Sequence, residues 1–378
     1  MSSSAGQPVH FIPAKNHRFL FLDALRGIAA VFVIFFHLPA STIHGLATNG
    51  FLSVDFFFCL SGFVIAFSYE KRLETSLSLK DFTVARLIRL YPLYLLGSVI
   101  GLLISALVHQ IAYGTGQSWS HWITTFTFGI FLWPARLSPV QSQVNFPLDI
   151  PAWSLFYELV ANLIFALLIK FRAAGSAAIG AIAAVSFAIL GLYAVKTGNL
   201  DLGNACNTFG MGFARVGFSF SAGVLLFRLY RSDFNKDFAV LKHWVLCVFV
   251  AISVIAILVA PIALMKSTTF RLSAICIWFP SLVYLGAITK LPHFLAGLSA
   301  VLGEISYPLY LLHGPFILTR RFHQYLESHS TIAPAIIFLS VTALAIASWW
   351  AGRYIDSPVR RFLTKRYNLL NNKISVTT

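Results

Sequence analysis

Ten apolar segments, each long enough to cross a lipid bilayer as a helix, occupy most of this 378-residue chain. They cover residues 19–39, 51–69, 90–111, 152–170, 174–195, 212–230, 243–264, 271–289, 296–318 and 332–354. Crossing the hydrocarbon core takes about 20 residues of α-helix. Only 11% of the residues are charged, compared with about 25% in soluble domains. The sequence therefore predicts an all-α polytopic membrane protein, a bundle of about ten transmembrane helices.

Lysine and arginine residues are distributed unevenly between the two sides of this predicted bundle. With ten spans and a cytoplasmic N-terminus, the inner segments hold 20 of them and the outer segments hold 6. Cytoplasmic loops of membrane proteins carry such an excess of positive charge. A further apolar piece, residues 119–134, would leave 13 on each side if it also crossed. We therefore expect both termini in the cytoplasm and residues 112–151 in one long outer loop.

The charge and cysteine content exclude several other classes of protein. The net charge of +15 follows from the basic residues of the inner side, and no basic run or motif predicts binding to nucleic acid. The four cysteines give no disulfide framework, and no Cys/His cluster has the spacing of a metal site, so we expect no metal. We expect one transmembrane domain, residues 19–354, between short cytoplasmic tails of residues 1–18 and 355–378.

The first apolar segment carries ionisable residues, which are costly inside a membrane and usually pair or line a functional cavity. Arg26 and His37 are eleven residues apart. Eleven helical steps of about 100° place them within roughly 20° of the same face, about 16 Å apart along the axis. The alternative is structural: Asp23 pairs with Arg26 at the inner end, and His37 is a core histidine whose hydrogen bonds are satisfied.

Two carboxylates near the outer ends of other segments are candidates to act beside His37. Asp55 lies one turn inside the second segment, and a carboxylate next to an imidazole fixes its tautomer and raises its basicity. The alternative is that Asp55 caps its helix at the interface. Glu158 lies about two turns inside the fourth segment and needs a partner from elsewhere in the chain. Arg215, which enters from the same side, is one possible partner.

Two arginines follow each other closely just before the third segment, at the end of the inner loop that we expect over residues 70–89, in the stretch ARLIRLYPLY. Arg86 and Arg89 are three residues apart, so they are neighbours on one face of a helix at the cytoplasmic boundary. Two guanidinium groups in this position suit the oxygens of a phosphate. Ordinary anchoring by basic residues explains the pair equally well. Arg26 also lies towards the inner side, and the three arginines together favour an anionic cytosolic ligand.

Polar and aromatic residues also occur in the fourth and ninth segments. The stretch IPAWSLFYELV contains Trp153, for which a place in the interfacial aromatic belt is the alternative to a binding role. The stretch GEISYPLYLLHGPF contains Tyr310 and His313. We expect Pro308 to break the helix there, since broken helices line cavities in membrane proteins. A second histidine inside the membrane favours a cavity that handles protons or binds hydroxyl groups.

Six motifs follow one another along the chain: LDALRGIAAVFVIFFH, SVDFFFCLSGFVI, ARLIRLYPLY, PAWSLFYELV, GEISYPLYLLHGP and YIDSPVRR. In this order they resemble the motifs of the membrane-bound acyltransferase family 3, which includes bacterial polysaccharide O-acetyltransferases. The family's Arg-x10-His pattern falls on Arg26 and His37, and its Arg-x2-Arg pattern falls on Arg86 and Arg89.

The resemblance implies an integral membrane O-acyltransferase of the bacterial cytoplasmic (inner) membrane. Such an enzyme moves an acyl group, with acetyl the expected one, from cytosolic acyl-CoA to a hydroxyl of a carbohydrate or lipid-linked glycan in the cell envelope. A secondary transporter of an anionic solute is the alternative, because it would also use buried arginine and histidine.

The resemblance also suggests roles for the candidate residues. We expect His37 to act as the general base, oriented by Asp55 or Glu158. The residues expected to hold the phosphate and pantetheine parts of acyl-CoA are Arg26, Arg86 and Arg89. The residues expected to line the acceptor site are Trp153, Tyr310 and His313.

Overall fold

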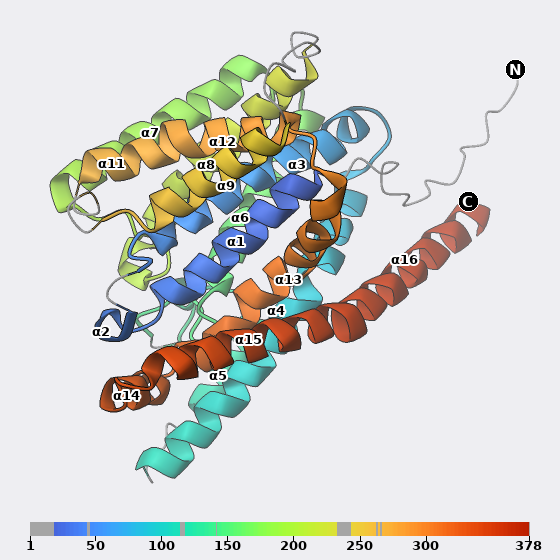
Figure 1. Cartoon of the computed structure of the whole chain (residues 1–378). Coiled ribbons are helices and arrows are strands. Elements are labelled where there is room, and N and C mark those ends of the chain that lie inside the picture. Colours follow the sequence, from blue (N-terminus) through green and yellow to red (C-terminus); the bar gives the residue numbers. More distant parts are fainter. Residues whose placement is uncertain are drawn as a thin grey trace, which may run out of the picture.

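The chain folds into a bundle of α-helices (Figure 1). The computed structural model describes residues 19–43, 46–113, 118–140, 142–232, 243–261, 264 and 267–377. The tail predicted over residues 1–18 lies outside these ranges. Within them, the only β-type pairing is an isolated antiparallel bridge between Val144 and Ala205.

The helices follow the predicted apolar segments closely. The longer ones are α1 (Leu20–Phe36), α3 (Ser53–Thr75), α4 (Leu79–Tyr113), α5 (Trp119–Ile130), α6 (Ala152–Lys170), α7 (Ser176–Thr197), α8 (Phe209–Arg231), α9 (His243–Leu258), α12 (Phe279–Ile288), α13 (His293–Ile317), α15 (Ala333–Ala351) and α16 (Ser357–Thr377). The shorter ones are α2 (Ala40–Ile43), η1 (Gly50–Leu52), η2 (Ala135–Leu137), η3 (Cys206–Thr208), α11 (Thr268–Ser273), η5 (Ala274–Trp278), α14 (Arg320–Ser328) and η6 (Gly352–Asp356).

Eight helical stretches of the described chain are long and apolar enough to cross a membrane. They coincide with eight of the ten predicted segments, and the other two segments form α1, with 17 residues, and α9, with 16. The prediction of an all-helical membrane bundle is confirmed, while the number of crossings and the side of each terminus stay predictions. Helix α5 has only 12 residues and rises about 18 Å, less than the hydrocarbon core of about 30 Å.

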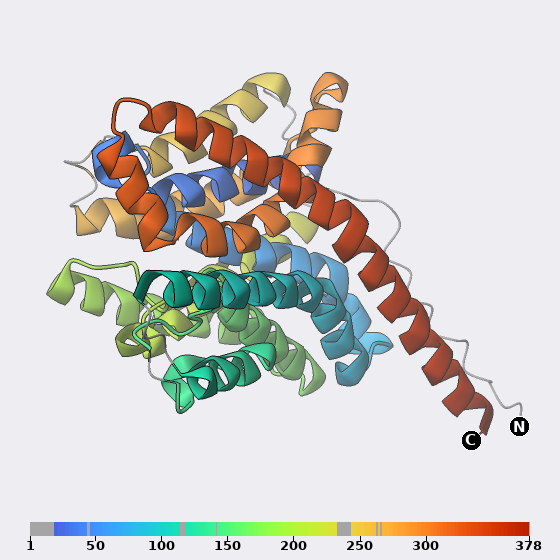
Figure 2. The same ribbon diagram turned by 90° about the horizontal axis from the view of Figure 1, so that it is seen from below.

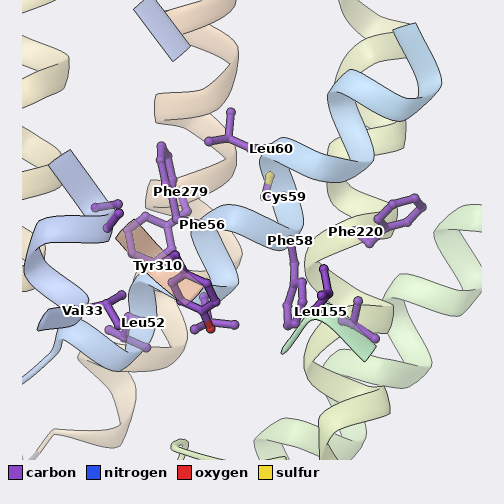
Figure 3. Close-up of a cluster of buried hydrophobic side chains, with 14 of the residues drawn as sticks. Val33, Leu52, Phe56, Phe58, Cys59, Leu60, Leu155, Phe220, Phe279 and Tyr310 are labelled. Carbon is purple, nitrogen blue, oxygen red and sulfur yellow. The ribbon is translucent and has the colours of Figure 1, made fainter. Parts of the chain in front are cut away.

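Helix α3 lies at the centre of the bundle. Among the 18 most apolar consecutive residues of η1 and α3, 78% are buried inside the protein. The corresponding share is 22% for α7 and for the helical stretch that contains α15. The apolar residues of α3 are distributed over all of its faces, as is typical of a buried helix. Figure 3 shows its side chains among those of neighbouring helices, and the Phe56 and Phe279 rings lie 5.5 Å apart, edge to face. The outer helices α7 and α15 leave apolar surface for lipid.

Two helix pairs dominate the packing: α1 lies along α13, and α3 lies along α8 (Figures 1 and 2). Helices α3 and α8 approach each other most closely at two glycines. A Cβ atom at Gly62 would lie 2.0 Å from the carbonyl oxygen of Phe220, and one at Gly223 would lie 2.0 Å from that of Cys59. Small residues allow this close contact between helix backbones in membranes.

A fully buried ion pair joins α3 to α8. The guanidinium of Arg215 donates to both carboxylate oxygens of Asp55, at 2.6 and 3.3 Å, and both side chains are 0% exposed. It also donates to the carbonyl oxygens of Phe51 and Leu202, at 3.1 and 2.9 Å. A buried charge is tolerated only with such compensation. The pair therefore fixes η1, α3, α8 and the loop before η3 relative to one another.

The expected helix break at Pro308 is wrong. Helix α13 continues from His293 to Ile317 with Pro308 and Pro315 inside it. Membrane helices tolerate proline where neighbouring helices stabilise the freed backbone. The Pro308 ring fits against Gly352, where a Cβ atom would lie only 3.2 Å from the proline Cγ. Packing against η6 therefore keeps α13 continuous.

We expect Gly62→Ala to destabilise the protein, because the added methyl group would overlap the carbonyl oxygen of Phe220. Overpacking of this kind costs about 1–3 kcal/mol, so the thermal unfolding midpoint of the purified protein should fall. Gly191→Ala in α7 is the matched control, since nothing lies within 4 Å of its added Cβ and alanine favours the helix. Equal midpoints for the two variants would contradict the close approach of α3 and α8.

Labelling of single cysteines tests the predicted topology. In a cysteine-free background, cysteines at Trp119, Arg136 and Lys196 should react with an impermeant maleimide from outside the cell. Cysteines at Lys71 and Lys365 should react only after permeabilisation. All five positions are exposed. Reaction of positions 119 and 136 from opposite sides would instead show that α5 crosses the membrane.

We expect Asp55→Asn to lower the stability of the fold, because it leaves the Arg215 guanidinium buried without its counter-charge. Breaking a buried ion pair costs about 3–5 kcal/mol, which thermal unfolding or the yield of monodisperse protein would register. Adding Arg215→Met to Asp55→Asn should restore part of the loss, since it removes the uncompensated charge. An Asp55→Asn protein as stable as the wild type would contradict a stabilising role for the pair.

Candidate active site

His37 follows the last residue of α1, and hydrogen bonds orient its ring. Its Nδ1 lies 2.8 Å from the carbonyl oxygen of Val33 and 3.3 Å from Nε2 of His313. A carbonyl oxygen only accepts, so Nδ1 carries the proton and Nε2 keeps the lone pair. Nδ1 of His313 lies 3.3 Å from the carbonyl oxygen of Leu309, so by the same reasoning its Nε2 accepts from His37. His37 is thus held in the tautomer that a general base requires at Nε2.

A pocket beside His37 brings several candidate residues together. It holds about 370 Å³ of empty space, open solvent included. Its aromatic and polar members are Phe36, His37, Phe51, Trp153, Asp201, Asn204 and Tyr310. Two of the three residues expected on the acceptor side, Trp153 and Tyr310, therefore share the pocket with His37. The third, His313, contacts the His37 ring directly.

The walls of this pocket are fixed by contacts that use up most of their polar groups. The hydroxyl of Tyr310 lies 2.7 Å from that of Ser154 and donates to the carbonyl oxygen of Pro151. The guanidinium of Arg215 lies over the indole of Trp153, with its Cζ atom 5.2 Å from the centre of the indole ring. Both aromatic side chains are held rigidly, which suits a binding surface.

The structure does not form the expected pair between Asp55 and His37. Both oxygens of Asp55 are bonded to Arg215, on the side of α3 that faces α8, while His37 bonds to Val33 and His313. A buried guanidinium needs a carboxylate more than a neutral imidazole does, because its charge cannot be removed. Asp55 therefore acts on the pocket only through Arg215.

Glu158 contacts neither His37 nor its suggested partner Arg215. Its Oε1 accepts from the hydroxyl of Ser61 at 2.7 Å and from the guanidinium of Arg86 at 3.1 Å. Helix α4 begins at Leu79, so Arg86 lies within the helix and reaches α6 instead of ending a loop. Arg86 and Arg89 are consequently not a free pair, because Glu158 already neutralises Arg86.

The other two candidate arginines lie beside α13. Arg26 donates to the Ser306 hydroxyl at 2.8 Å and pairs with Asp23 at 3.1 Å, so the structural alternative for Arg26 and Asp23 also applies. The guanidinium of Arg89 lies 5.4 Å from the centre of the Tyr307 ring. Arg26 and Arg89 therefore meet consecutive residues of α13.

Sequence reasoning missed two polar residues of the pocket, Asp201 and Asn204. Burial raises the pKa of Asp201, and Arg215, 3.8 Å away, opposes that shift. Between them, Gly203 adopts a φ of +102°, and its carbonyl oxygen accepts from the Asn145 amide at 2.9 Å. In the sequence of this loop, Gly203 is the only residue that indicates an unusual backbone conformation. No residue there indicates that the loop packs beside α1.

Asp149, just before α6, is a second titratable residue that the motifs did not mark. It is buried, and neither carboxylate oxygen has a hydrogen-bond partner among the described residues. The carboxyl group lies against Gly97 of α4 and Gly314 of α13. Burial raises its pKa well above the ordinary value, which favours the neutral acid.

Comparisons with known proteins identify the family. A family model described as an acyltransferase domain matches residues 19–354. "Protein 2 in picA locus" of Rhizobium radiobacter is 35% identical over 158 residues, which cover 39% of this chain and 81% of that protein. Peptidoglycan O-acetyltransferase OatA of Listeria monocytogenes is 37% identical over 92 residues, which cover 23% of this chain and 14% of OatA. No solved structure matches the chain. Because the family model covers most of the sequence, the chain belongs to the membrane-bound acyltransferase family 3, as its motifs predicted, and is a membrane O-acyltransferase.

Proposed function

We propose that this enzyme transfers an acetyl group from cytosolic acetyl-CoA to a hydroxyl of a carbohydrate or lipid-linked glycan at the bacterial cytoplasmic membrane. The observation that carries the proposal is His37, which lines an aromatic pocket and whose Nδ1 proton is hydrogen-bonded, so that Nε2 keeps its lone pair. A thioester is already activated, so the task of the enzyme is to deprotonate a weakly acidic alcohol. The name of the Listeria relative, a peptidoglycan O-acetyltransferase, supports this class of acceptor.

In this reaction Nε2 of His37 takes the hydroxyl proton while the hydroxyl oxygen attacks the thioester carbonyl. The tetrahedral intermediate expels the thiolate of CoA, and His37 returns the proton to sulfur. The products are an ester and a free thiol, and the histidine is neutral again. While His37 is charged, its Nδ1–H bonds to Val33 and His313 become stronger, because a charged donor bonds more tightly.

The donor reaches His37 from the side of the arginines. Arg26 lies on the same face of α1 as His37, about 16 Å away along the axis. Guanidinium groups suit phosphate oxygens, and the residues that mark this end of the route are Arg26, Arg86 and Arg89. Asp55 and Glu158 act by holding Arg215 and Arg86, so neither needs to touch the histidine.

We expect His37→Gln to lower turnover at least about a hundredfold, or by about 2.7 kcal/mol of barrier, since glutamine cannot accept the proton. Binding of acetyl-CoA should survive, because the phosphates lie far from this residue. His313→Gln should cost less, because it removes a hydrogen bond to the base and not the base itself. The measurement is release of CoA thiol from acetyl-CoA by protein in nanodiscs, with envelope glycan as the acceptor.

His329→Gln is the control, because this histidine is exposed and lies outside the pocket. Near-normal transfer by the His37→Gln enzyme would move the base elsewhere, with His313 the next candidate. A wild type that transfers no acyl group, but accumulates an anionic solute when a gradient is applied, would support the transporter instead.

A further inference from the structure

The stretch RYIDSPVRR, which follows the last predicted span, packs against the bundle. Helix α15 continues through the π-helical turn η6 into α16, and together they form one continuous bent helix whose C-terminal part projects past the others (Figures 1 and 2). Both η6 and α16 contact α4, and η6 also contacts α13. A π turn inserted between α-helices is frequent at functional sites. These contacts place η6 and α16 beside α4, the helix that carries Arg86 and Arg89.

Four side chains gather where α4, α13 and α16 meet. Arg360 donates to Asp356 at 2.9 Å, and Arg89 lies over the Tyr307 ring at 5.4 Å from its centre. Arg89 also interacts electrostatically with both Asp356 and Arg360. The four residues thus hold two guanidinium groups and one carboxylate, which leaves excess positive charge at this point. We call these four residues the α16 cluster.

The two arginines of the α16 cluster keep hydrogen-bond donors unused. Nε of Arg360 is buried and has no partner within the described chain. Arg89 contacts the Tyr307 ring but makes no hydrogen bond or ion pair with any described residue. Arg86, which pairs with Glu158, likewise has a buried Nε without a partner among the described residues, but it makes no contact with α16 in this cluster. Guanidinium groups with free N–H donors match the oxygens of a phosphate, which they bind in bidentate fashion.

One face of α13 connects the α16 cluster to the base. Ser306, Tyr310 and His313 are spaced at i, i+4 and i+7, so they lie on the same side of the helix. Ser306 accepts from Arg26, and His313 contacts His37. The α16 cluster includes the residue after Ser306, so it lies at the Arg26 end of this polar row. A phosphate bound there would direct the rest of its molecule along the row.

We propose that Arg360 joins Arg89, already placed on the donor route, in binding a phosphate group of the acyl donor, so that helix α16 forms part of the donor site. The proposal rests on the proposed function, in which that donor is acyl-CoA. Asp356 holds Arg360 in place, and Tyr307 supports the guanidinium of Arg89. The headgroup of an anionic phospholipid presents the same phosphate chemistry, so the experiment has to separate the two sources.

Binding of coenzyme A to the full-length protein, measured by calorimetry in nanodiscs of zwitterionic lipid, tests the proposal. Arg89→Gln and Arg360→Gln should each weaken binding at least tenfold. Lysine at either position should restore only part, because an ammonium cannot make a bidentate contact. Arg366→Gln, an exposed arginine further along α16, is the matched control and should bind coenzyme A as the wild type does.

Asp356→Asn separates phosphate binding from a purely structural role. It removes the counter-charge of Arg360 but keeps the arginine, and the amide oxygen of asparagine can still accept a hydrogen bond from the guanidinium and hold it in place. A phosphate site predicts that Asp356→Asn keeps or raises the affinity for coenzyme A while Arg360→Gln lowers it. Equal losses in the two variants would overturn the proposal, because they would show that only the ion pair matters.

The remaining outcomes distinguish the two levels of inference. A wild type that binds no coenzyme A would contradict the proposed function itself. A wild type that binds it, with both Gln variants unchanged, would overturn only the donor site at α16. Thermal stabilisation by phosphatidylglycerol that the Gln variants lose, with coenzyme A binding intact, would assign the α16 cluster to a lipid headgroup and also overturn the proposal.

Discussion

The buried ion pair between Asp55 and Arg215 is the interaction on which the geometry of the pocket depends. In a medium of low dielectric constant, a guanidinium must find acceptors for its N–H groups or the fold becomes unstable. Arg215 finds them on Asp55 and on the carbonyl oxygens of Phe51 and Leu202, and its face lies against Trp153. One side chain therefore ties together η1, α3, α6, α8 and the loop that carries Asp201. This demand also explains why Asp55 does not orient His37.

Charged groups inside the bundle fall into two kinds, and the difference bears on function. Asp55–Arg215, Arg86–Glu158 and Glu70–Arg228 are direct ion pairs between different helices, which hold those helices together. Arg89 makes no ion pair with a described residue, and Nε of Arg360, like that of Arg86, has no hydrogen-bond partner among those residues. Paired charges need no ligand, whereas a buried donor without a partner is costly unless something binds it. The phosphate of the proposed donor would lie beside charges of the second kind.

The sequence predicted the features that depend on local properties. Apolar length located the helices, and helical spacing placed Arg26 and His37 on one face of α1. Contacts between distant segments could not be predicted, because spacing along one helix says nothing about which helix it faces. His37 and His313 are 276 positions apart, and Asp55 and Arg215 are 160 apart. Plausible partners were therefore named, but Asp55 and Glu158 were matched to the wrong ones.

The loop that completes the pocket could not be predicted from the sequence either. Asp201 and Asn204 belong to the site only because Gly203, with its positive φ, and Arg215 hold their loop beside α1. Pro308 was expected to break a helix because the rule for proline considers one helix alone. The neighbouring Gly352 leaves room for the ring, and this compensation is invisible until the two helices are seen together.

In the proposed reaction, the packing of α1 on α13 limits the path that the donor can take to His37. A Cβ atom at Gly27 would lie 2.6 Å from the carbonyl oxygen of Leu302, and one at Gly303 would lie 2.7 Å from Cβ of Asp23. Contacts this close leave no space between the two helices at these points, so the acyl arm of the proposed donor would pass beside this contact. The side chain of Arg26 is 33% exposed whereas that of Arg215 is 0% exposed. We expect an arginine beside the donor path to be partly exposed, as Arg26 is. An arginine that only stabilises the fold is expected to be buried, as Arg215 is.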